Sequence, residues 1–245
     1  ITALVCRMAP GPVKTFSVGY PEARYSELGY AAEVARALGA EHREVVLTRE
    51  AFFEALPRLI WHEDEPITWP SSVALYFVAR LASEHVKVVL TGEGGDELFA
   101  GYDRYRWTLW NLRAGRIYGV LPAGLRRAVR RWIRTAPLVS ASLRRKLGHT
   151  FPGRETAIES LYLDNFLGAF GRDEQSRLLA GAPGDPYGSY LACWNRRPDA
   201  PALARLLYAD QKTYLVELLM KQDRMSMAAS IESRVPLLDH RFLAL

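Results

Sequence analysis

The sequence holds 245 residues, of which 49% are hydrophobic and 24% charged, with a formal net charge of +5. A chain of this size can bury the core of one large domain or two modest ones, and no stretch approaches the roughly 18 uninterrupted apolar residues that a membrane helix needs. The two cysteines, Cys6 and Cys193, lack metal-ligand spacing and are too few for a disulfide-stapled secreted fold. We therefore expect a soluble protein of the reducing cytoplasm.

Both ends of the chain have the character of interior sequence. The chain starts at Ile1 without an initiator Met or a signal-peptide pattern, and it stops at Leu245 in an apolar run without a capping residue. We interpret the sequence as an internal fragment of a longer protein.

Strands and helices alternate through the first hundred residues. The pattern predicts strands over 13–18, 42–47 and 86–90, and helices over 26–38, 49–61 and 72–83. Ser26 is the expected cap of the first helix and Gly39 its terminator, whereas the helix over 72–83 is so apolar that it must be buried. Strands joined by helical crossovers predict an α/β fold, a mostly parallel sheet with helices on both faces.

From about Asp96 onward the pattern is largely helical. We therefore expect an α/β nucleotide-binding part over 1–110 and a helical part over 111–245, together forming one domain.

Positive charge is concentrated in residues 113–147, which contain nine Arg and one Lys but no Asp or Glu. Removing these ten charges from the total of +5 leaves −5 for the remainder. A helix over 122–134 is expected to turn its apolar residues to the core and its arginines to solvent; the apolar residues are Leu125, Ala128, Val129, Trp132 and Ile133, and the arginines are Arg126, Arg127, Arg130, Arg131 and Arg134. A solvated outer face accounts for the pattern, while binding to RNA, lipid headgroups or an acidic partner stays open.

The residues after the strand over 86–90 carry the chemistry, because ligands bind at the carboxyl ends of parallel strands. Residues 91–102 read TGEGGDELFAGY, and residues 91–97 place three glycines and three acids in a strand-to-helix turn. The glycines allow close approach of a ligand, and the helix N-terminus favours an anion. Asp96 beside phosphates predicts a bridging Mg²⁺, although Asp96 and Glu97 could instead only cap the helix. Glu93, in the same turn, is expected to act as a base or to orient an amine.

This run resembles the asparagine synthetase signature S-G-E-G-S-D-E-[LVF]-F-G-G-Y, with Thr91 and Gly95 in place of the two serines. Residues 221–239, KQDRMSMAASIESRVPLLD, resemble a second family motif, D-R-x-[ST]-M-A-x-x-x-E-x-R-x-P-[FL]-L-D. Weaker similarities occur at residues 16–20, 64–66 and 70–72. The resemblance covers nearly the whole chain and implies the synthetase domain of the family, with an adenine nucleotide alpha hydrolase-like fold.

The resemblance also implies a reaction. Aspartate is adenylated by ATP to β-aspartyl-AMP with release of pyrophosphate, and ammonia from a glutaminase domain then yields asparagine. By similarity, Val18, Thr91 and Gly92 bind ATP, Asp96 binds ATP and Mg²⁺, and Glu93 is the first choice for a catalytic residue, followed by Glu232 and Arg234. Tyr102 would line the substrate end. A buried structural ion pair of Arg234 with Glu232 or Asp239 is the alternative for these residues.

The family's S-G-G-x-D-S pyrophosphate loop does not occur in this sequence, nor does a glutaminase domain. We therefore expect the chain alone to be inactive and the parent protein to be active. Two alternatives remain: a relative that adenylates a different carboxylate, and an inactive scaffold that binds RNA or a partner through the basic helix. Nucleic acid and membrane are not expected partners, and a homodimer is left open.

Overall fold

The computed structural model describes residues 1–135, 140–179 and 184–244. The chain forms two compact units: unit 1 comprises Ile1–Gly95 and Leu215–Leu245, and unit 2 comprises Asp96–Tyr214. The last segment, from Leu215, thus belongs to the unit that holds the first strands, whereas the sequence-based division at residue 110 grouped it with the helical part. That these units form one synthetase domain stays a prediction.

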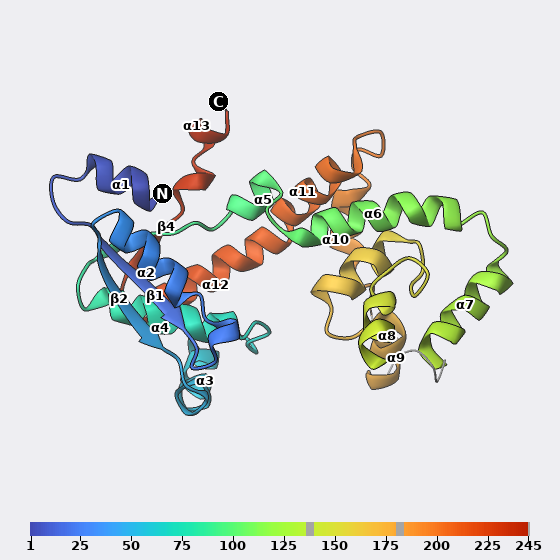
Figure 1. The fold of residues 1–245 in the computed structure, drawn as a ribbon, viewed down its shortest axis with the longest axis horizontal. Helices are drawn as coiled ribbons and strands as arrows, with labels where there is room; N and C mark the ends of the chain where they lie inside the picture. Colours follow the sequence, from blue (N-terminus) through green and yellow to red (C-terminus); the bar gives the residue numbers. More distant parts are fainter. Residues whose placement is uncertain (136–139, 180–183, 245) are drawn as a thin grey trace. The chain divides into compact units, whose positions relative to one another are not determined.

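Unit 1 has an α/β fold (Figure 1). Its elements are α1 (Thr2–Met8), β1 (Lys14–Gly19), η1 (Ala23–Tyr25), α2 (Leu28–Ala37), β2 (Glu41–Val46), α3 (Arg49–Glu63), α4 (Ser71–Ser83), β3 (Val88–Leu90), α12 (Tyr214–Ala228), β4 (Glu232–Arg234), η3 (Pro236–Leu238) and α13 (His240–Leu243). Both strand pairs, β1–β2 and β3–β4, are parallel. The predicted α/β class with parallel strands is therefore confirmed.

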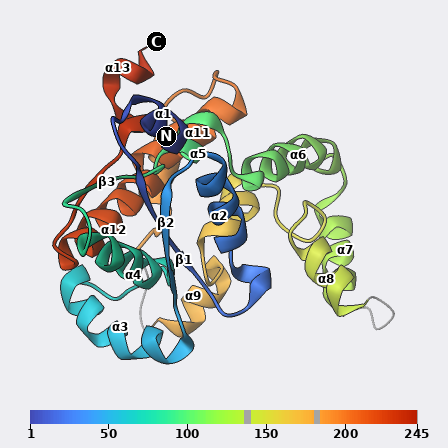
Figure 2. The ribbon, with the colours of Figure 1, turned by 60° about the vertical axis from the view of Figure 1, so that its left-hand side comes forward.

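Helices cover both faces of the β1–β2 sheet (Figure 2). On one face, a Cβ on Gly19 would lie 2.4 Å from Leu28 of α2, so the glycine permits that close packing. On the other face, Val18 and Leu47 pack in one cluster with Val73 of the predicted buried helix α4. Burial of this apolar helix against the strands stabilises unit 1.

The two strand pairs lie against the same apolar cluster. Phe16 of β1 and Val89 of β3 both pack on Ala79, Ala82 and Ile231. The middle of β3 therefore packs on the same cluster as β1.

Two local predictions in unit 1 were wrong. Ser26 does not cap α2: it follows η1 in an extended conformation, and the helix starts at Leu28 with Glu27 as its N-cap. β4 was expected to be helical; its polar residues form a strand because β3 offers them a hydrogen-bonding partner. Gly39, by contrast, has φ 66 just beyond α2, as expected of a helix terminator.

Unit 2 is helical apart from its connections. Its elements are α5 (Gly95–Phe99), which begins in unit 1, α6 (Asp103–Tyr118), α7 (Ala123–Thr135), α8 (Ala141–Gly148), the π-helix η2 (Glu159–Leu167), α9 (Arg172–Leu178), α10 (Gly188–Trp194) and α11 (Ala202–Lys212). Its core gathers aromatic residues from α6, η2 and α10 around Leu206 and Ala209 of α11.

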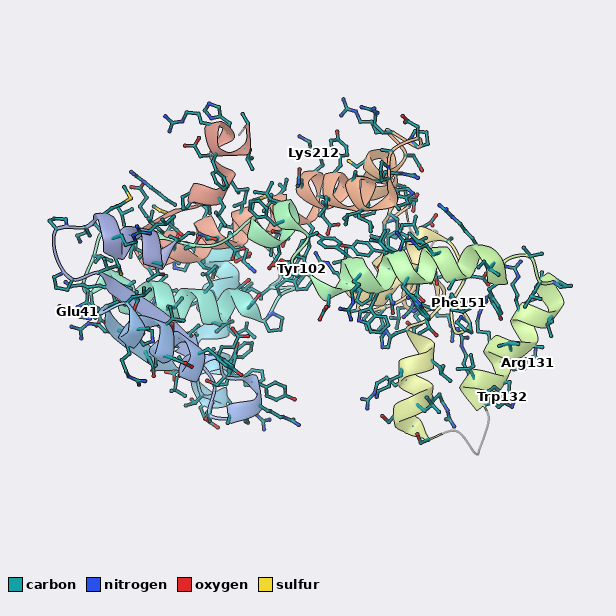
Figure 3. The ribbon with its side chains drawn as sticks, turned by 45° about the horizontal axis from the view of Figure 1, so that its top comes forward. Glu41, Tyr102, Arg131, Trp132, Phe151 and Lys212 are labelled. Atoms are coloured by element: carbon teal, nitrogen blue, oxygen red, sulfur yellow. The ribbon has the colours of Figure 1, made fainter. Side chains whose placement is uncertain are left out.

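The basic helix α7 is present, but it is rotated from its predicted orientation (Figure 3). Leu125 and Trp132 are 50% and 59% exposed, whereas Ile133 is 3% exposed. Arg130 turns inward with Ile133 because its guanidinium pairs with Glu155. The prediction that all the arginines face solvent was therefore wrong.

Candidate active site

The turn after β3 is held in place by β4 and α12. The Thr91 N–H donates to the Arg234 carbonyl at 2.9 Å, and the Thr91 hydroxyl accepts from Nε2 of Gln222 at 2.8 Å. Gln222 is only 3% exposed. It was not predicted as a site residue, although it stands inside the second motif. The Thr91 hydroxyl therefore has a fixed position at the carboxyl end of β3.

Glycines let the turn pack against the C-terminal motif. Gly94 has φ +87, and a Cβ there would lie 2.4 Å from Leu238. A Cβ on Gly95 would lie 3.1 Å from Leu237. Residue 94 must be glycine both for its conformation and for this approach. The two motifs that carried the resemblance are thus in direct contact within unit 1.

The acidic residues of the turn differ in exposure. Glu93 is partly buried, whereas Asp96 is exposed in the first turn of α5, where a carboxylate is favoured by the helix dipole. The Asp96 carboxylate leaves no space beside Gly101, where a Cβ would lie 1.9 Å from Oδ1. The Gly101 N–H also donates to the Asp96 carbonyl at 3.1 Å. Gly101 therefore fixes the position of Asp96.

Glu232 and Arg234 stand on the same side of β4, two residues apart. β4 pairs in parallel with β3, with Val88 opposite Glu232 and Leu90 opposite Arg234, so Arg234 reaches the edge where Thr91 begins the turn. Nε of Arg234 donates to Glu232 at 2.7 Å, and both side chains are more than half exposed.

The alternative, an ion pair of Arg234 with Glu232, is present in the structure, but the pair is not buried. Asp239 pairs with Arg241 at 2.8 Å instead. An exposed pair adds only about 0–1 kcal/mol to stability, so the two side chains are available to a ligand.

Val18 and Tyr102 lie in other surroundings. Val18 is next to the last residue of β1, paired with Val45, and borders a pocket of about 500 Å³. The Tyr102 hydroxyl donates to Glu97 at 2.7 Å, and its ring lies 4.0 Å from Cζ of Arg104. Burial, and secondly Glu97, raises the pKa of Tyr102. Val18 and Glu93 belong to unit 1, whereas Asp96 and Tyr102 belong to unit 2.

The arrangement suits a Mg²⁺ ion bound with a substrate. Within residues 1–135, 140–179 and 184–244, no three His, Cys, Asp or Glu side chains gather as a ready-made metal site. Mg²⁺ in phosphate-transfer sites is usually bound through one or two carboxylates and the substrate's phosphates. The exposed Asp96 carboxylate beside the glycine turn fits that mode.

No described helix is long and apolar enough to cross a membrane.

Comparison with known proteins matches this chain to one family. The family described as asparagine synthase matches residues 1–245. A Mycobacterium tuberculosis protein provisionally named a glutamine-hydrolysing asparagine synthetase is 36% identical over the whole chain, which covers 36% of that relative. Asparagine synthetase [glutamine-hydrolyzing] 1 of Bacillus subtilis is 34% identical over 93% of the chain and 35% of its own length.

A more distant relative carries a different name. Amidase chyE of Penicillium rubens is 25% identical over 94% of the chain and 36% of its own length. The chain spans about a third of the length of the curated relatives it matches. Because the family match extends from the first residue to the last, the chain belongs to the asparagine synthase family.

Proposed function

We propose that the protein containing this chain makes asparagine from aspartate, ATP and glutamine-derived ammonia, and that this chain carries the adenylating site. The observation that carries the proposal is the packing of residues 91–95 against Leu237 and Leu238 at the carboxyl ends of β3 and β4. It gathers the two family motifs into one ligand-facing edge.

The proposed reaction has two steps. The β-carboxylate oxygen of aspartate forms a bond to the α-phosphorus of ATP, and the bond to pyrophosphate breaks. Ammonia then attacks the β-carbonyl carbon of β-aspartyl-AMP, AMP leaves, and one proton is lost to give the neutral amide. Binding and orientation of the two reacting groups supply much of such a rate enhancement.

Each site residue has a proposed role. The Thr91 hydroxyl and the exposed backbone at Gly92 hold ATP, Val18 contacts the adenosine, and Glu93 is the carboxylate that orients ammonia and accepts its proton. Arg234, oriented by Glu232, grips the aspartate carboxylate or a phosphate through two N–H groups. Asp96 holds Mg²⁺, which when bound screens the charge of the phosphates. Tyr102 is proposed only to border the substrate end, since its hydroxyl already donates to Glu97.

A second proposal keeps the adenylation but changes the acid. The similarity to an amidase whose name does not mention asparagine supports it. In the proposed site, the turn and Asp96 bind ATP and do not select the carboxylic acid.

The parent protein is expected to be cytoplasmic. Neither nucleic acid nor a membrane is expected as a partner, and a homodimer is left open. We expect residues 1–245 alone not to synthesise asparagine, since no S-G-G-x-D-S run occurs in them.

Pyrophosphate release by the full-length protein tests the proposal, with ATP, Mg²⁺ and glutamine, and with aspartate compared with other carboxylic acids. We expect release to require aspartate and to fall at least about 100-fold in Glu93→Gln. Glu33→Gln, an exposed acid on α2, is the matched control and should behave as wild type. Release driven by another acid would support the second proposal. No release with any acid would contradict both and favour a scaffold.

A further inference from the structure

Unit 2 holds a pocket that the proposed reaction does not use. It measures about 860 Å³ and is bounded by α7, α8, η2, α9 and the loop over 149–158, and Figure 2 shows α7 and α8 side by side. This volume is in the range of small-molecule sites. None of the residues proposed above for ATP, aspartate or ammonia lines it.

One wall of the pocket is a π-helix. η2 is π-helical over nine residues and supplies Ser160, Asp164 and Asn165 to the lining. π-helical turns are rare and are found frequently at functional sites, where they displace side chains from regular α-helical spacing. A π-helical wall is therefore consistent with a binding site here.

His149 lines this pocket, and one of its ring nitrogens is without a hydrogen-bond partner among the described residues. Nδ2 of Asn165 donates to the carbonyls of His149 and Leu161 at 3.1 and 3.3 Å, which leaves Oδ1 to meet Nδ1 of His149 at 2.5 Å. Because an amide oxygen only accepts, the proton is assigned to Nδ1. No described residue bonds Nε2, which can accept when the ring is neutral and donate when it is protonated.

Arg154 is a partly buried cation whose charge is incompletely compensated. Nη1 donates to the Ser160 carbonyl at 3.1 Å, but Nε is buried without a hydrogen-bond partner among the described residues. Burial lowers the pKa of Arg154, and Asp164 offsets this only in part. A guanidinium in this state is stabilised by an anion that accepts from its free N–H groups.

The acids of the lining already hold donors, which decides the sign of the ligand. Glu155 pairs with Arg130, Asp164 accepts from the Tyr187 hydroxyl, and Glu174 accepts from the Gly171 N–H at 3.0 Å. Glu159 is the remaining acid, whereas four arginines line the pocket besides Arg130; these are Arg134, Arg144, Arg154 and Arg177.

We propose that this pocket binds a small phosphate monoester, with the phosphate held by Arg154 and by Nε2 of His149. A phosphate offers three oxygens, enough for a forked guanidinium and the imidazole together, whereas a carboxylate has two. The pocket is much larger than one phosphate, so an organic part fills the remainder. This inference is independent of the proposed amide synthesis.

Calorimetric titration of the full-length protein tests the proposal, with glucose 6-phosphate, glucuronate and inorganic phosphate as probes and with saturating ATP covering the adenylation site. We expect glucose 6-phosphate to bind at least about tenfold more tightly than glucuronate. Arg154→Met should weaken that binding at least about tenfold. Arg131→Met, on the same helix as Arg130 but outside the lining, is the matched control and should leave it unchanged.

A second measurement needs no variant that could fold poorly. In the wild-type protein, phosphate binding should shift the Nε2 resonance of His149. Equal affinity for glucuronate would overturn the choice of phosphate. No binding at about 10 mM of either phosphate probe, or a His149 resonance that phosphate does not move, would overturn the site itself.

Discussion

Arg104 and Asp210 form the ion pair at the centre of unit 2, with Nη2 of Arg104 3.1 Å from Oδ2 of Asp210. Asp210 is fully buried and also accepts from the hydroxyls of Tyr105 and Tyr162. The ring of Tyr102 covers the guanidinium, 4.0 Å from Cζ. This network connects α6 with η2 and α11, and Tyr102 in turn holds Glu97 of α5. The segment that carries Asp96 therefore rests on a buried polar network.

Asp210→Ala should lower the free energy of unfolding by about 3–5 kcal/mol, because it leaves the Arg104 charge buried and two tyrosine hydroxyls without their acceptor. Urea denaturation measures this. Asp199→Ala is the control: Asp199 faces Arg197 across 3.8 Å with both side chains at least 75% exposed, so the loss should stay below about 0.5 kcal/mol. A loss below about 1 kcal/mol in Asp210→Ala would mean that the network is not a main support of unit 2.

Gly94→Ala should destabilise the protein by about 2–4 kcal/mol, through its positive φ and the contact of the new methyl with Leu238. Gly92→Ala is the matched control, since a Cβ there meets nothing within 4 Å. Its thermal unfolding should equal that of wild type, while its KM for ATP rises if the backbone at Gly92 approaches the nucleotide. Equal stability of the two variants would show that residue 94 does not need glycine.

The elements that could be predicted are those with a repeating apolar pattern. β1 and β2 were expected over 13–18 and 42–47 and occur at Lys14–Gly19 and Glu41–Val46, because short apolar segments that alternate with helical segments leave a clear signal. β4 could not be found in this way: Glu232, Ser233 and Arg234 are polar, and only pairing with β3 makes them a strand.

The buried face of α7 also could not be predicted from the local sequence. Its apolar pattern favoured burial of Trp132, yet Arg130 is turned inward by Glu155, far along the chain. Within the candidate site, Thr91 and Glu93 could be proposed from local sequence. Gln222, which holds Thr91, is separated from it by 131 residues and has no local signal of that contact.

Ala100→Gly should stabilise the protein by about 0.5–1 kcal/mol. Ala100 has φ 57 between α5 and α6, and the left-handed conformation is costly for any residue with a Cβ. Ala37→Gly, at the exposed end of α2, is the control and should lose about as much as Ala100→Gly gains. Thermal unfolding compares them. If Ala100→Gly also loses stability, the backbone at residue 100 is not strained.

Glu63→Gln should make the protein more stable at neutral pH. Glu63 is 5% exposed, and its Oε2 has no hydrogen-bond partner among the described residues. Burial, only partly opposed by Arg224, raises the pKa of Glu63. The protonated form of Glu63 is therefore favoured in the folded state. Its burial costs no stability below the pKa of Glu63 in the unfolded chain, about 4.3. Stability is lost as the pH rises through the pKa of Glu63 in the folded state, because the buried carboxylate becomes charged.

The difference in unfolding free energy between Glu63→Gln and wild type should therefore grow between about pH 4.5 and pH 7.5 in the denaturation curves. Glu65→Gln is the control, because Glu65 is half exposed and pairs with Arg224 at 3.0 Å. It should gain no stability at either pH. A Glu63→Gln difference that is the same at both pH values would argue against a raised pKa.

Arg234→Met separates a role in binding from a role in stability. The pair with Glu232 is exposed, so unfolding should change by no more than about 1 kcal/mol. If Arg234 grips the substrate, aspartate-dependent pyrophosphate release should fall at least about tenfold. Arg241→Met removes a comparable exposed pair, with Asp239, and should keep full activity. Activity lost equally in both variants would assign the effect to the fold of residues 232–241, whereas activity kept in Arg234→Met would remove Arg234 from the site.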